Sequence, residues 1–153
     1  MSADDRVKEL DLELPPAPKP AGVYKPIVIS GNMAYVSGHG PLKPDESMYC
    51  GRVGGDVDKD GGYTAARQVG LAILATLQSQ LGSLNRVKQL VKTLGMVNAA
   101  PDFKDHPAVI NGYSDLMRDV FGEEIGVGAR SAVGMGSLPG NISVEVEAIF
   151  EIE

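Results

Sequence analysis

The stretch Ile142–Ile152, with the sequence ISVEVEAIFEI, alternates apolar and polar side chains along almost its whole length. This period of two is typical of a β-strand with one buried face, because successive side chains of a strand point to opposite sides of a sheet. The segment Ala129–Ser137 alternates in the same way, and the residues Leu138–Asn141 between the two segments favour a turn. The sequence therefore predicts an antiparallel β-hairpin in this part of the chain.

The register of the predicted hairpin follows from its apolar residues. One register sets Val133 opposite Val146, whereas a shift by one residue would set Val133 opposite Glu145, so the apolar pairing selects the first. The other face then carries Arg130 and Glu147 beside small residues. A half-covered face that combines charge with small residues is typical of a sheet that meets a partner subunit.

The rest of the chain supplies further strands and two helices. Apolar residues at spacings of three and four predict each helix, and β-rich runs predict the strands. The expected elements are strands over Ile27–Ser30 and Met33–Ser37, a helix over Tyr63–Leu81 with Gly82 as its C-terminal cap, a strand over Val87–Val97 and a helix over Pro107–Phe121. Residues 38–62 are dense in Gly, Pro and Asp, which predicts a long surface loop with at most a short strand at Cys50–Val53. The order predicts an α+β fold with two helices on one face of a mixed sheet.

The amino-acid composition disfavours several classes of protein, namely nucleic-acid-binding, disulfide-bonded, zinc-binding and membrane-spanning proteins. The chain has 153 residues, with 14 basic and 20 acidic side chains and a formal net charge of −6, which disfavours nucleic acid as a partner. Its single cysteine, Cys50, excludes an internal disulfide, and with His39 and His106 it makes no zinc ligand set. The first residues lack the basic start and apolar run of a signal peptide, and no apolar stretch is long enough for a membrane span, so we expect a cytoplasmic protein. We assign residues 1–20 to an N-terminal extension and residues 21–153 to a single domain.

Three polar residues stand out as candidates for chemistry. Arg130 offers a planar guanidinium that grips a carboxylate through two parallel hydrogen bonds; the alternative is a cross-strand ion pair with Glu145 or Glu147. Glu145 is a candidate to move a proton or to hold a water molecule, and the alternative is a solvated surface carboxylate. His39, next to Gly38, is a candidate proton donor, and the alternative is a neutral surface histidine.

The residues around these candidates resemble a known family. The run Gly128–Gly134, the pair Leu138-Pro139 and the run Val144–Ile149 look like the signature of the Rid/YjgF family, the reactive-intermediate (enamine/imine) deaminases. Tyr24, Gly31-Asn32-Met33, Ser37-Gly38 and Asn111 extend the resemblance over about residues 20–153.

The resemblance implies a fold, an assembly and a reaction. The fold is the bacillary chorismate-mutase-like α+β fold, assembled as a homotrimer whose sheets form a central barrel with clefts between subunits. The implied reaction is hydrolysis of 2-aminoacrylate and related imines to a 2-keto acid and ammonia, without a metal or an organic cofactor. By resemblance, Arg130 holds the substrate carboxylate, Glu145 positions a water molecule, and the cleft is lined by Tyr24, Ser37, Gly38, His39, Asn111 and Ala132.

The chain also departs from the family pattern. Ala132 stands where many members have cysteine, His39 replaces the usual polar residue, and the region from Pro44 to Gly62 is longer than in compact members. These differences indicate a divergent subgroup. Two other functions stay open: a module that binds a carboxylate metabolite without chemistry, and an endoribonuclease or translation inhibitor, which the net charge of −6 disfavours.

Overall fold

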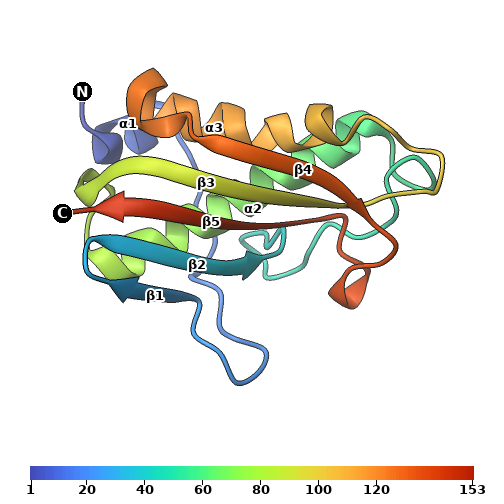
Figure 1. The fold of residues 1–153 in the computed structure, drawn as a ribbon, viewed down its shortest axis with the longest axis horizontal. Helices are drawn as coiled ribbons and strands as arrows, with labels where there is room; N and C mark the ends of the chain where they lie inside the picture. Colours follow the sequence, from blue (N-terminus) through green and yellow to red (C-terminus); the bar gives the residue numbers. More distant parts are fainter.

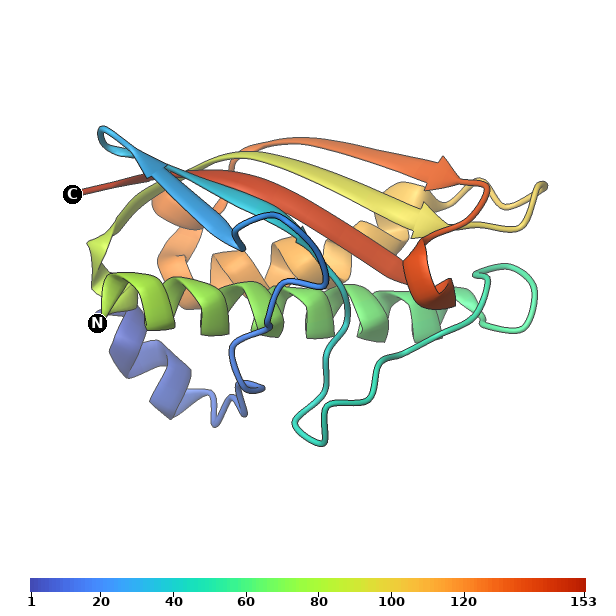
Figure 2. The same ribbon diagram turned by 90° about the horizontal axis from the view of Figure 1, so that it is seen from below.

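A five-stranded mixed sheet, covered on one face by helices, makes up the computed structural model, which describes residues 1–153 (Figures 1 and 2). The strand order is β1-β2-β5-β3-β4. Only the pair β3–β4 is parallel. The strand bounds are β1 Ile27–Ser30, β2 Met33–His39, β3 Val87–Asn98, β4 Ala129–Met135 and β5 Val144–Ile152. The predicted α+β class is confirmed.

Two long helices cover one face of the sheet, as the sequence predicts. They are α2, Lys59–Leu81, and α3, His106–Gly126, and they lie side by side beneath the strands in Figure 2. Helix α2 begins four residues before the predicted start, because the Asp58 side chain accepts a hydrogen bond of 2.7 Å from the Gly61 amide and caps the helix there. It ends at Gly82, whose φ of 84° gives the left-handed cap that the sequence indicates.

The N-terminal segment lies against the helical layer. Residues Ala3–Glu9 form helix α1, which contacts α3, and the Asp4 carboxylate accepts a hydrogen bond of 3.0 Å from the Leu84 amide just before β3. The apolar side chains of Ala3 and Val7 pack against the main core. None of the helices combines the length and the apolar character that crossing a membrane requires.

The predicted hairpin between the last two strands is wrong. Strand β3 lies between β4 and β5, so Val133 is paired with Met96 of β3 and not with Val146. Strand β3 and helix α3 lead into a parallel β4, a connection that requires a crossover, while β5 returns antiparallel on the other side of β3. The segment Leu138–Asn141 does form a turn, but the connection from β4 to β5 that contains it passes across the end of β3.

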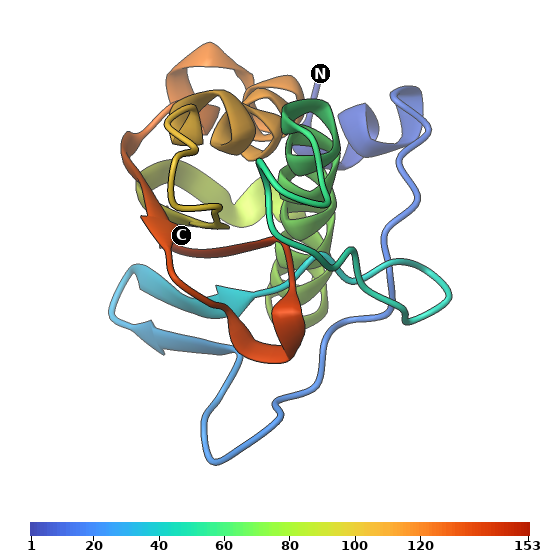
Figure 3. The same ribbon diagram turned by 90° about the vertical axis from the view of Figure 1, so that its right-hand side faces the viewer.

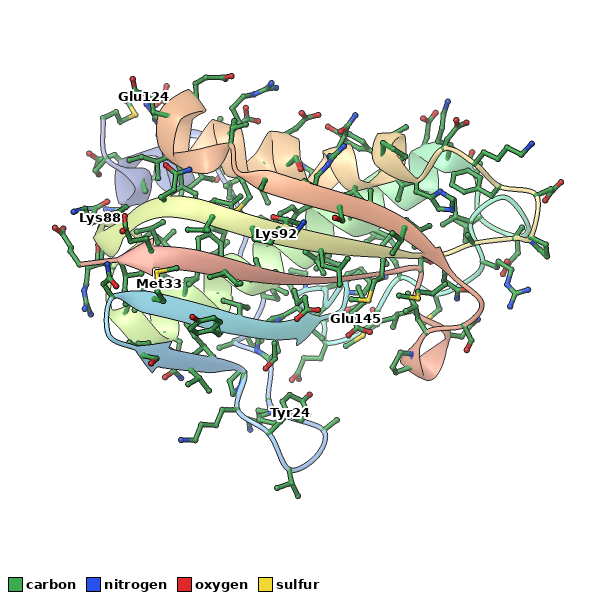
Figure 4. The ribbon with its side chains drawn as sticks, in the orientation of Figure 1. Tyr24, Met33, Lys88, Lys92, Glu124 and Glu145 are labelled. Atoms are coloured by element: carbon green, nitrogen blue, oxygen red, sulfur yellow. The ribbon has the colours of Figure 1, made fainter.

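The helix-free side of the sheet, here called the open face, is the side toward the viewer in Figure 4, where Met33, Lys92 and Glu145 are labelled. Along β5 the side chains that point to the helices are buried, whereas Glu145, Glu147 and Ile149 point to the open face. Val133 of β4 is also on this face and is 36% exposed. Because β4 pairs with β3, its predicted faces are exchanged, and Arg130 points toward α3.

Candidate functional site

Glu145 lies in a cleft at one end of the open face. The cleft has a volume of about 410 Å³ and lies where β2 ends and β5 begins. Two other residues that the sequence singled out, Tyr24 and Gly38, line it as well. The remaining lining, which the sequence did not reveal, comes from Gly40, Met48, Cys50, Pro139, Gly140 and Ile142. The sequence predicts residues 38–62 only as a loop, and isolated bridges such as Cys50 to Ile142 leave no periodic pattern that would reveal which loop residues line the cleft.

The carboxylate of Glu145 has an unusual environment for an acidic group on a strand. Burial raises its pKa above the ordinary range, and the nearby charge of Glu147 raises that pKa further. Its side chain packs directly on the backbone of Gly38, where an added Cβ would overlap Oε2 and lie 3.0 Å from Cδ. Gly38 is thus the residue that leaves room for Glu145.

Tyr24 lies in the loop before β1, and Ser37 lies in β2, the strand that pairs with β1. Tyr24 is 49% exposed, lies in the loop at the bottom of Figure 4, and its hydroxyl accepts a hydrogen bond of 3.2 Å from the Ala21 amide. The Ser37 hydroxyl donates a bond of 2.6 Å to the carbonyl oxygen of Lys25. Ser37 therefore does not line the cleft and instead holds the segment that carries Tyr24.

Arg130 is held by helix α3 and makes no ion pair. Its Nη1 donates hydrogen bonds to Asn111 Oδ1 at 2.8 Å and to Ser114 Oγ at 3.1 Å. The predicted alternative, a pair with Glu145 or Glu147, is wrong, since the ion pairs of the chain are Lys59–Asp105 and Arg118–Asp115. The Nε and Nη2 atoms of Arg130 have no partner within the chain, so part of the guanidinium fork is free for a ligand.

Three of the predicted site residues gather on the helix side of β4. Asn111 contacts Arg130 directly, and Ala132 lies two residues after Arg130 on the same face of the strand, where it packs against the core. Ser114 completes this group and is not among the residues predicted from the sequence. Its spacing of three from Asn111 places both on one helix face, which is the signal that could have found it.

Arg130 and Glu145 point to opposite sides of the sheet. Their partners on the shared neighbour β3 are Thr93 and Met96, an odd number of residues apart. Thr93 is buried and points to the helices, and its partner Arg130 likewise points to α3. Glu145 lies on the open face. The chain therefore presents two half-sites, an acidic one with Tyr24, Gly38 and Glu145 and a basic one with Asn111, Arg130 and Ala132.

His39 has a structural position that neither sequence interpretation anticipated. Its side chain is 4% exposed and points into the core, where Nε2 lies 2.7 Å from Thr76 Oγ1 and Nδ1 lies 2.6 Å from the Ser37 carbonyl oxygen. Burial lowers the pKa of His39, and the hydrogen bond to Ser37 opposes that effect. The imidazole is thus outside the cleft. No group of three or more His, Cys, Asp or Glu side chains lies together in an arrangement that holds a metal ion.

Comparisons of sequence identify relatives of known description. Residues 4–148 match the family described as "YjgF/chorismate_mutase-like, putative endoribonuclease". The chain is 40% identical to "Protein TCP17" of Trypanosoma cruzi over 146 residues, which cover 95% of this chain and 91% of that protein. It is 27% identical to the 2-iminobutanoate/2-iminopropanoate deaminase of Dermatophagoides farinae over 143 residues, or 93% of this chain and 95% of that one.

Solved structures show the same fold at two levels of similarity. Atu1372 of Agrobacterium tumefaciens, a protein of unknown function, has a TM-score of 0.89 and 41% identity, covering 99% of this chain and 94% of its own. A "putative endoribonuclease" from Shewanella oneidensis has a TM-score of 0.94 and 30% identity, covering 99% and 100%. RidA from an Antarctic Psychrobacter has a TM-score of only 0.60 with 27% identity, covering 89% and 94%. The fold is therefore shared with RidA, but the detailed shape is nearer to the first two proteins.

Proposed function

The chain belongs to the YjgF/chorismate-mutase-like family, and we propose that it hydrolyses small imines that carry a carboxylate, together with their enamine tautomers such as 2-aminoacrylate. The observation that carries the proposal is the pair of complementary half-sites, a partly desolvated carboxylate at Glu145 and a partly free guanidinium at Arg130. An imine substrate with a carboxylate needs both of these groups. A deaminase of 2-iminobutanoate and 2-iminopropanoate among the relatives supports this substrate class.

The proposed reaction needs few protein groups because an imine carbon is already electrophilic. Arg130 binds the substrate carboxylate through the atoms of its fork that α3 leaves free. A water oxygen forms a bond to the carbon of the protonated imine while Glu145 accepts a proton from that water, and the electron pair of the carbon–nitrogen double bond moves to the nitrogen, which becomes an amine. Glu145 then passes the proton to that nitrogen. The carbon–nitrogen bond breaks, ammonia leaves with its electron pair, and the hydroxyl group on the carbon gives its proton to Glu145, which leaves a 2-keto acid. The raised pKa of Glu145 makes its carboxylate a better base for the first step.

A complete site of this kind requires two chains. Because Arg130 and Glu145 point to opposite faces of one sheet, the two half-sites serve one substrate only where the helix side of one chain meets the open face of another. We propose that the chain forms a homotrimer with its sites in the clefts between subunits. Large apolar side chains exposed on the sheet and its edge support burial against a partner, and they include Val28, Ile29, Tyr35, Val91 and Val133.

Light scattering on the purified protein tests the assembly directly. We expect a mass of about three chains of 16.1 kDa each at micromolar concentration. A monomer would contradict the two-chain site, whatever the activity.

The activity is tested by the disappearance of 2-aminoacrylate generated by a coupled dehydratase. We expect turnover by the wild type and a loss of about 100-fold or more in Glu145→Gln, since a positioned base contributes that much. Arg130→Lys keeps the charge but loses the planar fork, so it should weaken substrate binding by an order of magnitude or more. Arg118→Lys and Glu151→Gln are the matched controls, because they make the same changes outside both half-sites.

Two outcomes would favour the other functions. Binding of pyruvate or 2-oxobutyrate in a calorimeter that depends on Arg130, without imine turnover, would indicate a binding module. Cleavage of RNA that Glu145→Gln abolishes would indicate a ribonuclease. We expect no cleavage, because the chain has a net charge of −6 and Glu145, Glu147 and Glu151 all point to the open face.

A further inference from the structure

A second cleft, of about 380 Å³, lies where the parallel strands β3 and β4 end. The loops before α2 and α3 meet at this end of the molecule, which faces the viewer in Figure 3. The loop before α2 is fixed to the end of β3, since the Val53 amide donates to the Asn98 carbonyl at 2.7 Å and the Ala100 amide donates to the Val53 carbonyl at 2.8 Å. The cleft is thus built from anchored segments and shares no lining residue with the Glu145 cleft.

One wall of this cleft carries an arginine with unused hydrogen-bond donors. Arg52 Nη2 donates to the Gly136 carbonyl at 2.7 Å, which holds the side chain across the end of β4. Its Nε and Nη1 atoms have no partner in the chain, and no carboxylate lies within 4.0 Å of the guanidinium. Asp56 accepts from the Arg52 amide at 2.8 Å and Asp105 pairs with Lys59 at 4.0 Å, while Asp102, between the lining residues Pro101 and Phe103, is exposed.

The same cleft is also lined by a histidine that packing alone holds in place. His106 meets the ring of Phe103 edge to face, with centroids 5.5 Å apart and an interplanar angle of 89°. Its ring also lies directly on Gly134, where an added Cβ would overlap Nε2. Neither ring nitrogen has a hydrogen-bond partner in the chain, yet neither is buried out of reach. The imidazole therefore offers a positioned donor to a ligand.

We propose that this cleft binds a small organic anion, a carboxylate or a phosphate monoester with an apolar body. The anion lies between Arg52 and His106, which supply charge-assisted hydrogen bonds. The apolar body packs on Phe103 and Met135, which line the same cleft. Gly136 leaves the entrance open, because an added Cβ there would have no atom within 4 Å.

The site uses neither of the two groups proposed for the imine chemistry, Glu145 and Arg130. Arg130 precedes Gly134 by four residues, about 13 Å along an extended strand, while Ala132 of the basic half-site lies two residues before Gly134 on the same face. A failure of this proposal therefore leaves the imine proposal untouched, and the reverse also holds.

The test is a titration of the full-length protein with phenyl phosphate, benzoate and benzamide. Binding is measured by calorimetry and by the changes in the amide NMR shifts of Gly134 and Gly136. We expect at least one of the two anions to bind with shifts confined to this cleft, and neutral benzamide to bind at least tenfold more weakly. The anion that binds identifies the source as phosphate or carboxylate. Binding of benzamide as tight as that of both anions, or binding of neither anion, would overturn the proposal.

Three variants and a control locate the binding. Arg52→Gln and His106→Phe should each weaken anion binding by tenfold or more, because the first removes the charge and the second keeps an aromatic ring but removes both ring nitrogens. Gly136→Leu should block the cleft while leaving the thermal melt unchanged, since its side chain enters open space. Arg118→Gln, an exposed arginine on α3 outside the cleft, should bind as the wild type does. Equal binding by all four variants would show that the anion binds elsewhere.

Discussion

The proposed two-chain site is tested most sharply by combining two inactive variants in one oligomer. Arg130→Ala removes the carboxylate anchor on the helix side of the sheet, and Glu145→Gln removes the base on the open face. Each variant alone has every site damaged in the same way. We expect residual activity of about 1% or less for Glu145→Gln, from the usual contribution of a positioned base, and a marked loss of turnover at low substrate for Arg130→Ala.

The mixed oligomer should recover activity because the damaged residues come from different chains. In a cyclic trimer that contains both variants, one interface joins an intact Arg130 of one chain to an intact Glu145 of the next. Such a trimer should show about one-third of the wild-type activity, whereas a two-fold dimer would show about one-half. The recovered fraction therefore also reports the number of chains in the ring.

The assay uses two affinity tags, one on each variant, with co-expression and purification on both tags in sequence. Turnover of 2-aminoacrylate is measured per mole of oligomer at a low substrate concentration, where sites without Arg130 stay largely empty. The control carries both tags on Arg130→Ala chains and should stay at the level of that variant. If mixed oligomers form but show no gain over the two parent variants, both residues act within one chain or not at all, and a site shared between two chains is refuted.

Three further perturbations follow from the geometry of single residues. Gly38→Ala should displace the Glu145 carboxylate, because the new Cβ would overlap Oε2, and we expect turnover to fall by tenfold or more with little change in KM for the carboxylate substrate. Glu147→Gln removes a charge that raises the pKa of Glu145, so the acid limb of the pH–rate profile should move to lower pH, whereas Glu151→Gln on the same face should leave the limb in place. Because the pKa of buried His39 is lowered, the unfolded chain takes up a proton first as pH falls below the ordinary value of 6.5, so the free energy of unfolding should decrease there. Urea denaturation at several pH values should show this decrease in the wild type and not in His39→Gln; equal pH dependence in the two would contradict the assignment.

The sequence by itself determined which segments become helices and strands and which side of most of them is buried. The alternation in Ile142–Ile152 predicted β5 and the exposure of Glu145, because a strand exposes a fixed pattern of side chains whatever strand it pairs with. The apolar stripes likewise predicted α2 and α3, whose packing against a sheet needs only a continuous apolar face. Gly82, as a left-handed cap, shows that a local signal is sufficient where the structure it describes is local.

Only the tertiary structure decided which strand lies beside which, and with it the chemistry of Arg130. Apolar side chains of β5 find apolar partners on β3 as readily as on β4, since Val144 pairs with Val97, so periodicity could not choose between a hairpin and a crossover. The insertion of β3 turned Arg130 away from the glutamates and toward Asn111. The burial of His39 was also decided by the tertiary structure, because its hydrogen-bond partner Thr76 lies on α2, far from it along the chain. Local pattern encodes the faces of an element, whereas the partner of each face is set by packing between segments distant in sequence, which no local pattern records.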